Sequence, residues 1–184
     1  VSFADGRLVE VALVGREGAV GGIVSNGRLP AFSTAIVQSG GTFFRVALRE
    51  LDALKNKAPG LRNLFARYAD CLMAQIYQST ACNAAHSIEA RCAKWMLAAI
   101  DRTESKTLVL THEHLATLLG VGRSYASRIL MGMKSTGVLH LSRGRIVVDD
   151  CAALESIACD CDSLVRAHFD TVLAGIYPDG SKHG

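Results

Sequence analysis

The stretch 110–149 constrains the fold of this chain more than any other part, because it orders two short amphipathic helices, a tight turn and an alternating hairpin. Thr111 is a good N-cap for the first predicted helix, since its hydroxyl can accept an unpaired backbone N–H. Gly120 can adopt the left-handed conformation that ends a helix. Three apolar residues share one face of this helix: Leu115, Leu118 and Leu119.

A second helix is predicted to start near Arg123, with Gly122 as its cap. Its apolar residues recur at i, i+3, i+4 and i+7 and should face inward: Ala126, Ile129, Leu130 and Met133. Its polar residues share the outward face: Arg123, Ser124, Ser127 and Arg128. Small residues, Ala116 and Ala126, stand where two crossing helices would come closest. A helix with a short, cationic outer face fits the DNA major groove, where Arg can bind guanine through two hydrogen bonds.

Strands are predicted over 138–141 and 146–148, around a turn at 142–145 that contains Gly144. Arg143 and Arg145 lie at the tip of this hairpin, where they would meet phosphates rather than bases. The order of cap, turn, polar face and basic hairpin indicates a winged helix-turn-helix. The alternative is a plain helical hairpin with a solvated charged face.

This stretch resembles the winged helix-turn-helix of the Crp/Fnr superfamily of bacterial transcription regulators, and the resemblance extends upstream to about Leu8. In that family, the Arg that opens the recognition helix and the Arg five residues later contact bases, and they match Arg123 and Arg128. The family residue directly after the first of these arginines is often a Glu that reads cytosine, whereas this chain has Ser124 after Arg123. Further DNA contacts are expected around these positions: Thr111, Gly122, Tyr125, Ser127, Lys134, Arg143 and Arg145.

Residues 1–57 are predicted to be β structure, with strands over 7–14, 35–38 and 42–47 separated by glycines, and with a short helix near Leu51 and Leu54. The resemblance implies the C-terminal part of a β-roll sensor domain, a jelly roll like those that bind cyclic nucleotides. The chain opens on Val1, and we expect the N-terminal part of this domain to be missing. The predicted fold class is therefore α+β, with a partial β-roll, a long dimerisation helix and a winged helix-turn-helix domain.

The predicted effector pocket lacks the residues that bind cyclic nucleotides in the family. A Gly-Glu pair there binds the ribose and an Arg-Ser pair binds the cyclic phosphate, whereas this chain aligns Gly21-Gly22 and Phe32-Ser33 with them. A buried phosphate without a cationic partner is costly, so we do not expect cyclic AMP to bind. The pocket is predicted at Gly21, Gly22, Phe32, Ser33 and Thr34, with an unknown effector and no cofactor.

A long helix is predicted over 58–83, after Ala58-Pro59-Gly60. Its apolar residues form a broad stripe: Leu61, Leu64, Phe65, Tyr68, Leu72 and Ile76. The resemblance implies that this stripe pairs with its twin across a two-fold axis. The alternative is ordinary packing within one chain.

The remaining chain divides into a winged helix-turn-helix domain over 84–150 and a helical tail over 151–184, with a hinge at 83–86. Ser87 should cap a helix whose inner stripe contains Ile88, Cys92, Trp95, Met96 and Ala99. In the tail, residues 152–157 and an apolar series at 165, 169, 172 and 176 predict two further helices.

Six cysteines without a C-x-x-C pair fit a reducing cytoplasm. Cys159 and Cys161 are the only tight cluster, and without a second ligand pair at zinc spacing we predict no metal site. His112-Glu113-His114 does not resemble a helical zinc motif, since residue 116 is Ala where a second His would be needed. No motif supports catalysis.

The chain has 184 residues, 49% hydrophobic and 20% charged, with a net charge of +3 and no run long enough for a membrane helix. We therefore predict a cytoplasmic homodimeric transcription regulator that binds a near-palindromic operator in double-stranded DNA. The resemblance also implies RNA polymerase as a partner, and no membrane. One alternative is a degenerate β-roll dimer that serves as a protein-interaction module with weak DNA binding. Another is an enzyme on a cupin-like roll.

Overall fold

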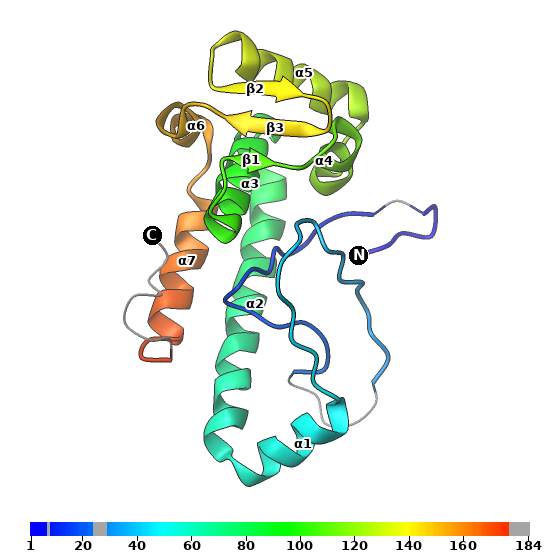
Figure 1. Ribbon diagram of the computed structural model, residues 1–184, viewed down its shortest axis with the longest axis vertical. Coiled ribbons are helices and arrows are strands. Elements are labelled where there is room, and N and C mark those ends of the chain that lie inside the picture. The colour runs from blue at the N-terminus through cyan, green and yellow to red at the C-terminus, as the bar shows by residue number, and fades with distance from the viewer. Residues whose placement is uncertain (7, 24–28, 177–184) are drawn as a thin grey trace.

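The computed structural model describes residues 1–6, 8–23 and 29–176. The longest helix is α2. The winged domain lies at one end of α2, and α1 lies at the other end (Figure 1). The elements follow in this order: α1 (Leu48–Lys57), α2 (Pro59–Ala85), α3 (Ile88–Thr103), β1 (Thr107–Leu108), α4 (His112–Leu119), α5 (Arg123–Ser135), β2 (Leu139–Ser142), β3 (Arg145–Val148), α6 (Cys151–Ile157) and α7 (Cys161–Val172).

The winged domain has its own apolar core, made by α3, α4, α5, α6 and the sheet. The predicted inner stripe of α3 is confirmed, because Cys92, Trp95, Met96 and Ala99 are all buried. Ser87 caps α3 as predicted, with its hydroxyl accepting the N–H of Ala90. The largest side chains with almost no exposure lie in this core: Met96, Leu115, Leu130, Met133, Leu139, Ile146 and Leu154.

Three short antiparallel strands form the sheet in the order β1-β3-β2. The predicted wing is confirmed as the β2–β3 hairpin, in which Ser142 pairs with Arg145. Gly144 adopts a φ of 70° at the turn, which an L side chain rarely adopts. Thr107 and Leu108 pair with β3, so the lead-in to α4 is fastened to the wing.

A second, smaller core joins α2 to α7 and to the N-terminal segment. Tyr68 of α2 and Phe169 of α7 meet edge to face, with ring centroids 6.3 Å apart. The Tyr68 hydroxyl also accepts the N–H of Ala19 at 3.1 Å. Helix α7 therefore lies alongside α2 (Figure 1), and the two tail helices predicted from the sequence are confirmed as α6 and α7.

The predicted β-roll strands are wrong for the part of residues 1–47 that the structure describes. Its described residues hold one isolated bridge, Ser2 to Leu8, and otherwise form turns, bends and chain without regular secondary structure. The strand predicted to start at Arg7 begins outside the described residues. Strands need neighbours that take up their N–H and C=O groups, and no neighbour among the described residues pairs with 35–38 or 42–47. Their apolar side chains are accordingly exposed, with Phe44 93% exposed.

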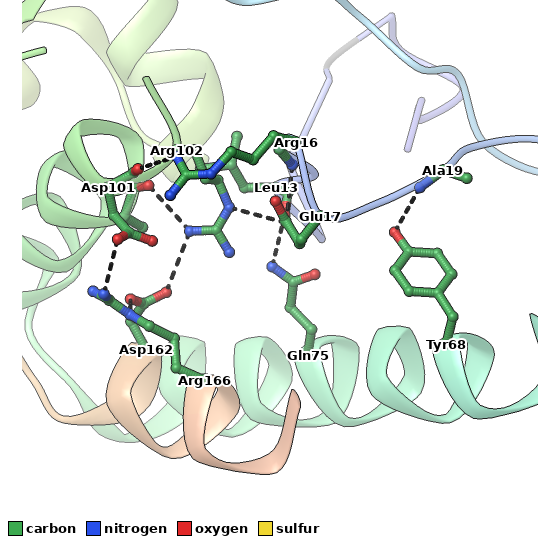
Figure 2. Close-up of polar contacts among 12 residues, drawn as sticks. Leu13, Arg16, Glu17, Ala19, Tyr68, Gln75, Asp101, Arg102, Asp162 and Arg166 are labelled. Atoms are coloured by element: carbon green, nitrogen blue, oxygen red, sulfur yellow. Dashed lines mark hydrogen bonds and ion pairs between the residues drawn. The ribbon is translucent and has the colours of Figure 1, made fainter. Parts of the chain in front are cut away.

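Buried ion pairs fasten the N-terminal segment to α3 and α7 (Figure 2). Arg102 of α3 lies 3.5 Å from Glu17 and 3.8 Å from Asp162 of α7. Arg166 of α7 binds Asp162 at 2.8 Å and Asp101 at 3.2 Å. These pairs should stabilise the contact between the segments, because removing one charge would leave its partner uncompensated in a poorly solvated site.

The hinge predicted at 83–86 is shorter than expected, because α2 continues to Ala85. His86 is its C-cap and Ser87 already caps α3, so the two helices are joined without a loop. Among the described residues, no helix combines the length and apolar character needed to cross a membrane.

Candidate nucleic-acid interface

The turn between α4 and α5 has the capping geometry predicted from the sequence. The Thr111 hydroxyl accepts the N–H of His114 at 3.1 Å, and Gly120 ends α4 with a φ of 69°. Ala116 and Ala126, predicted at the crossing of the helices, are 2% and 0% exposed. Their small size lets α5 lie close across α4.

The two faces of α5 divide as predicted except at Ser127, which was predicted on the outer face and is half-buried. The inner face is confirmed, since Ala126, Ile129, Leu130 and Met133 are all buried. The outer face exposes Arg123, Ser124, Tyr125 and Arg128. The Arg128 guanidinium lies over the Tyr125 ring, 5.2 Å from its centroid, so the two side chains form one exposed platform.

Two contacts from α4 reach this outer face, and the sequence analysis missed both. The Glu113 carboxylate lies 3.8 Å from Nε of Arg123, and both side chains are largely exposed. His112 Nδ1 lies 2.9 Å from the Ser127 hydroxyl, which turns Ser127 toward α4. Helical periodicity places residues on a face of their own helix but does not reveal partners on another helix.

The start of α5 has no side-chain cap, because its N-cap is Gly122. Its first N–H groups thus lack a side-chain acceptor at the helix end where the partial charge is positive. Helix N-termini of this kind bind phosphate.

The wing adds two exposed arginines, Arg143 and Arg145, and Lys134 is exposed in the last turn of α5. Leu110 donates its N–H to the carbonyl of Gly144 at 3.0 Å, which fixes the wing tip against the start of α4. The structure thus presents exposed cations from α5 and the wing on one domain.

The predicted effector pocket is not formed by the described residues. Phe32 is 92% exposed, and Ser33 and Thr34 are exposed as well, because no described sheet closes around them. Gly21 is also exposed, with a φ of 104°, and Gly22 is half-buried. An effector site at these positions stays a prediction.

The stripe predicted for dimerisation mostly faces inward, against α7 and the N-terminal segment. Tyr68 is 5% exposed, and Leu64, Phe65 and Leu72 pack onto the same core. Leu61 is half-buried, and Ile76 is 40% exposed. The alternative of packing within one chain therefore accounts for much of this stripe.

Residues 90–157 match the model of the Crp-like helix-turn-helix domain. Solved structures with a similar fold include FixK2 from Bradyrhizobium japonicum (TM-score 0.55, 15% identity, 62% of this chain and 60% of that one). Others are TTHB099, a CRP-family transcriptional regulator from Thermus thermophilus (0.51, 23%, 59% and 57%), and TTHA1359, a CRP/FNR-family regulator from the same organism (0.50, 22%, 55% and 55%). This chain thus spans 55 to 60% of these structures. No curated protein matches its sequence.

Proposed function

Because residues 90–157 match a Crp-like helix-turn-helix domain, we propose that the chain is a sequence-specific regulator of transcription that binds double-stranded DNA as a homodimer. The observation that carries the proposal is the outer face of α5, which exposes Arg123 and Arg128 on a helix buried along its other side. Five residues span ~7.5 Å along a helix. The two guanidinium groups would therefore reach base pairs about two steps apart in the major groove.

Glu113 is proposed to position the Arg123 side chain before DNA arrives. Their separation of 3.8 Å and high exposure make this a weak pair, which base contacts can replace at little cost. On DNA, the carboxylate would either hold the guanidinium in plane or accept from a cytosine amino group. In the family pattern, a Glu at the position of Ser124 accepts from cytosine, and Glu113 would take over that role in this chain.

Ser127 is proposed to support rather than read the DNA, since its hydroxyl is already engaged with His112 at 2.9 Å. The uncapped start of α5 at Gly122 and the Thr111 hydroxyl suit the phosphates on either side of the groove. Arg143, Arg145 and Lys134 would add phosphate contacts that do not depend on sequence.

Dimerisation is proposed along a face of α2 that shares only Ile76 with the predicted stripe. Four residues with an alternating spacing of three and four form a largely exposed seam on this helix: Ala66, Ala69, Met73 and Ile76. Met73 and Ile76 are 48% and 40% exposed, and Tyr77 beside them is 68% exposed. This is the spacing at which two helices pair, with small residues allowing close approach. A two-fold axis here would give two recognition helices ~34 Å apart on a near-palindromic operator.

No effector follows from the described residues, and we keep the prediction that cyclic AMP does not bind. Gly22 and Phe32 stand where the family has its ribose carboxylate and phosphate guanidinium. Calorimetry should give no heat of binding at micromolar cyclic AMP. A micromolar dissociation constant would show that the alignment of this pocket is wrong.

The test of DNA reading begins with selection of a binding site from random duplex DNA, because the operator is unknown. Arg123→Ala and Arg128→Ala should each weaken the selected site by ~1–3 kcal/mol and relax preference at one base pair per half-site. Arg145→Ala should weaken selected and scrambled DNA alike and reduce the salt dependence. Arg49→Ala, an exposed charge on α1, is the matched control.

Equal losses on both DNAs for Arg123→Ala would refute base reading by this residue. Failure of the wild type to select any site would instead favour the alternative, a protein-interaction module with weak DNA binding. The exposed apolar side chains of the N-terminal segment, Phe32, Phe43 and Phe44, are the observation in favour of that alternative.

A further inference from the structure

Four potential metal ligands from two segments of the chain, 82–86 and 159–161, converge where the end of α2 meets the start of α7. Cys82 lies in the last turn of α2 and His86 is its C-cap, whereas Cys159 lies between α6 and α7 and Cys161 is the first residue of α7. The three sulfur atoms and a ring nitrogen all lie within 4.8 Å of one another. Cys82 and Cys161 are 0% and 1% exposed. None of these residues belongs to the DNA-reading face.

The distances fit a tetrahedron around one ion. Cys82 Sγ lies 3.6 Å from Cys159 Sγ, and Cys161 Sγ lies 3.4 Å from His86 Nδ1. With zinc–sulfur and zinc–nitrogen bonds of ~2.3 and ~2.05 Å, the tetrahedral edges would be about 3.8 Å between two sulfurs and about 3.6 Å between sulfur and nitrogen. The side chains are thus close to ligand positions without a change in the helices.

The ligand spacing supports the same conclusion. His86 is the C-cap of α2, four residues after Cys82, and the two ligand atoms lie within 4.8 Å of one another. Cys159 and Cys161 flank a single residue at the start of α7. Predicting no metal site was therefore based on a wrong premise: a second ligand pair does accompany Cys159 and Cys161, but 73 residues or more upstream (159 − 86 = 73).

Two side chains around the four ligands suit thiolates. Gln78 donates from Nε2 to Cys161 Sγ at 3.2 Å, and Lys94 of α3 donates from Nζ to Cys82 Sγ at 3.5 Å. Zn²⁺ with three thiolates and a neutral imidazole carries a net charge of −1, which the Lys94 ammonium offsets. Such outer partners orient metal ligands and adjust their affinity.

We propose that Cys82, His86, Cys159 and Cys161 form a closed, tetrahedral Zn²⁺ site that fastens the α2–α3 junction to the start of α7. Thiolate and imidazole ligands select zinc over magnesium or calcium. Four protein ligands leave no open position, so the site is structural and not catalytic. A disulfide between Cys82 and Cys159 would leave Cys161 and His86 without a role. An iron–sulfur cluster would need its protein ligands farther apart, because they bind different iron atoms with bridging sulfides between them.

The first measurement is metal analysis of the 184-residue chain purified under reducing conditions. One zinc per chain should remain after dialysis, and cobalt substitution should give the visible bands of tetrahedral thiolate-bound Co²⁺. Cys161→Ser should lose the zinc, whereas Cys151→Ser, a half-buried cysteine outside the cluster, should keep it. Gln78→Ala should bind zinc about 10-fold more weakly.

The design remains decisive if Cys161→Ser fails to fold, because cobalt spectra and chelator-dependent melting need only the wild type. Zinc removal should lower the melting temperature of the wild type and of Cys151→Ser alike. A wild type that binds neither zinc nor cobalt would overturn the proposal. So would a Cys82–Cys159 disulfide in the freshly isolated protein, or iron and sulfide in place of zinc.

Discussion

Replacing Glu10 with Gln should change how the stability of this protein depends on pH. Glu10 lies in the N-terminal segment, and its carboxylate accepts the indole N–H of Trp95 of α3 at 2.8 Å. Burial raises the pKa of the Glu10 carboxyl from 4.5 to about 7, although the Trp95 hydrogen bond and the nearby Lys94 and Arg102 charges oppose the rise. The side chain thus binds a proton more tightly in the folded chain than in the unfolded one.

The sign of the effect follows from this order of pKa values. Below pH 4.5 both states are protonated, and the stabilisation from the neutral carboxyl is fully present. As the pH rises from 4.5 to about 7, the unfolded state releases its proton first and that stabilisation is lost. A shift of this size corresponds to ~3 kcal/mol, and the partial exposure of Glu10 reduces the expected loss to ~2 kcal/mol.

Glu10→Gln keeps an oxygen that can accept the Trp95 N–H and removes the titration. Urea unfolding of both proteins at pH 5 and pH 8 should show the variant gaining ~2 kcal/mol relative to the wild type at the higher pH. Cysteine and histidine ionisation affects both proteins alike and cancels in the difference. Glu50→Gln, at an exposed carboxylate of α1, is the matched control.

Parallel stability curves for Glu10→Gln and the wild type would refute the reasoning, since they would mean that Glu10 releases its proton equally in both states. A variant that is less stable by the same amount at both pH values would show that only the hydrogen bond to Trp95 matters.

Three further predictions concern packing. Gly132→Ala should stabilise the protein by ~1 kcal/mol in thermal unfolding, because nothing lies within 4 Å of the added carbon in α5, whereas Gly120→Ala should destabilise it at a φ of +69°. Ile76→Asp should give a monomer in sedimentation while circular dichroism shows intact helices, and Asn63→Asp, at an exposed position of α2 outside the seam, should stay dimeric. A dimeric Ile76→Asp would remove this seam from the interface. Tyr68→Phe should cost ~1 kcal/mol in urea unfolding by leaving an N–H of the N-terminal segment unpaired, and an unchanged midpoint would mean that water replaces the hydroxyl.

The winged helix-turn-helix could be predicted because its determinants are local. Thr111, Gly120 and Gly144 set backbone conformations within a few residues of themselves, and the 3.6-residue period of α5 selects its buried face. Each of these signals holds whatever the rest of the chain does. The fold of residues 107–148 therefore agrees with the sequence almost residue by residue.

The N-terminal segment could not be predicted in the same way, because a strand depends on its partner. The short apolar runs at 35–38 and 42–47 are typical of strands, yet the described chain offers no neighbour to pair with them. The stripe on α2 failed for a related reason. Periodicity predicts that Tyr68 and Leu72 are buried. It does not predict that they pack against α7, which comes about 90 residues later in the sequence.

Several long-range contacts that the sequence did not predict lie around the junction between α2 and the winged domain. The Glu10–Trp95 bond, the Arg102 ion pairs and the proposed zinc ligands all join segments that are distant in the sequence. The DNA-reading face is thus encoded locally, whereas its orientation relative to α2 depends on these long-range contacts. In a dimer built along α2, that orientation sets the distance between the two recognition helices. Loss of the zinc site should therefore alter the preferred spacing of operator half-sites and leave the bases read within each half-site unchanged.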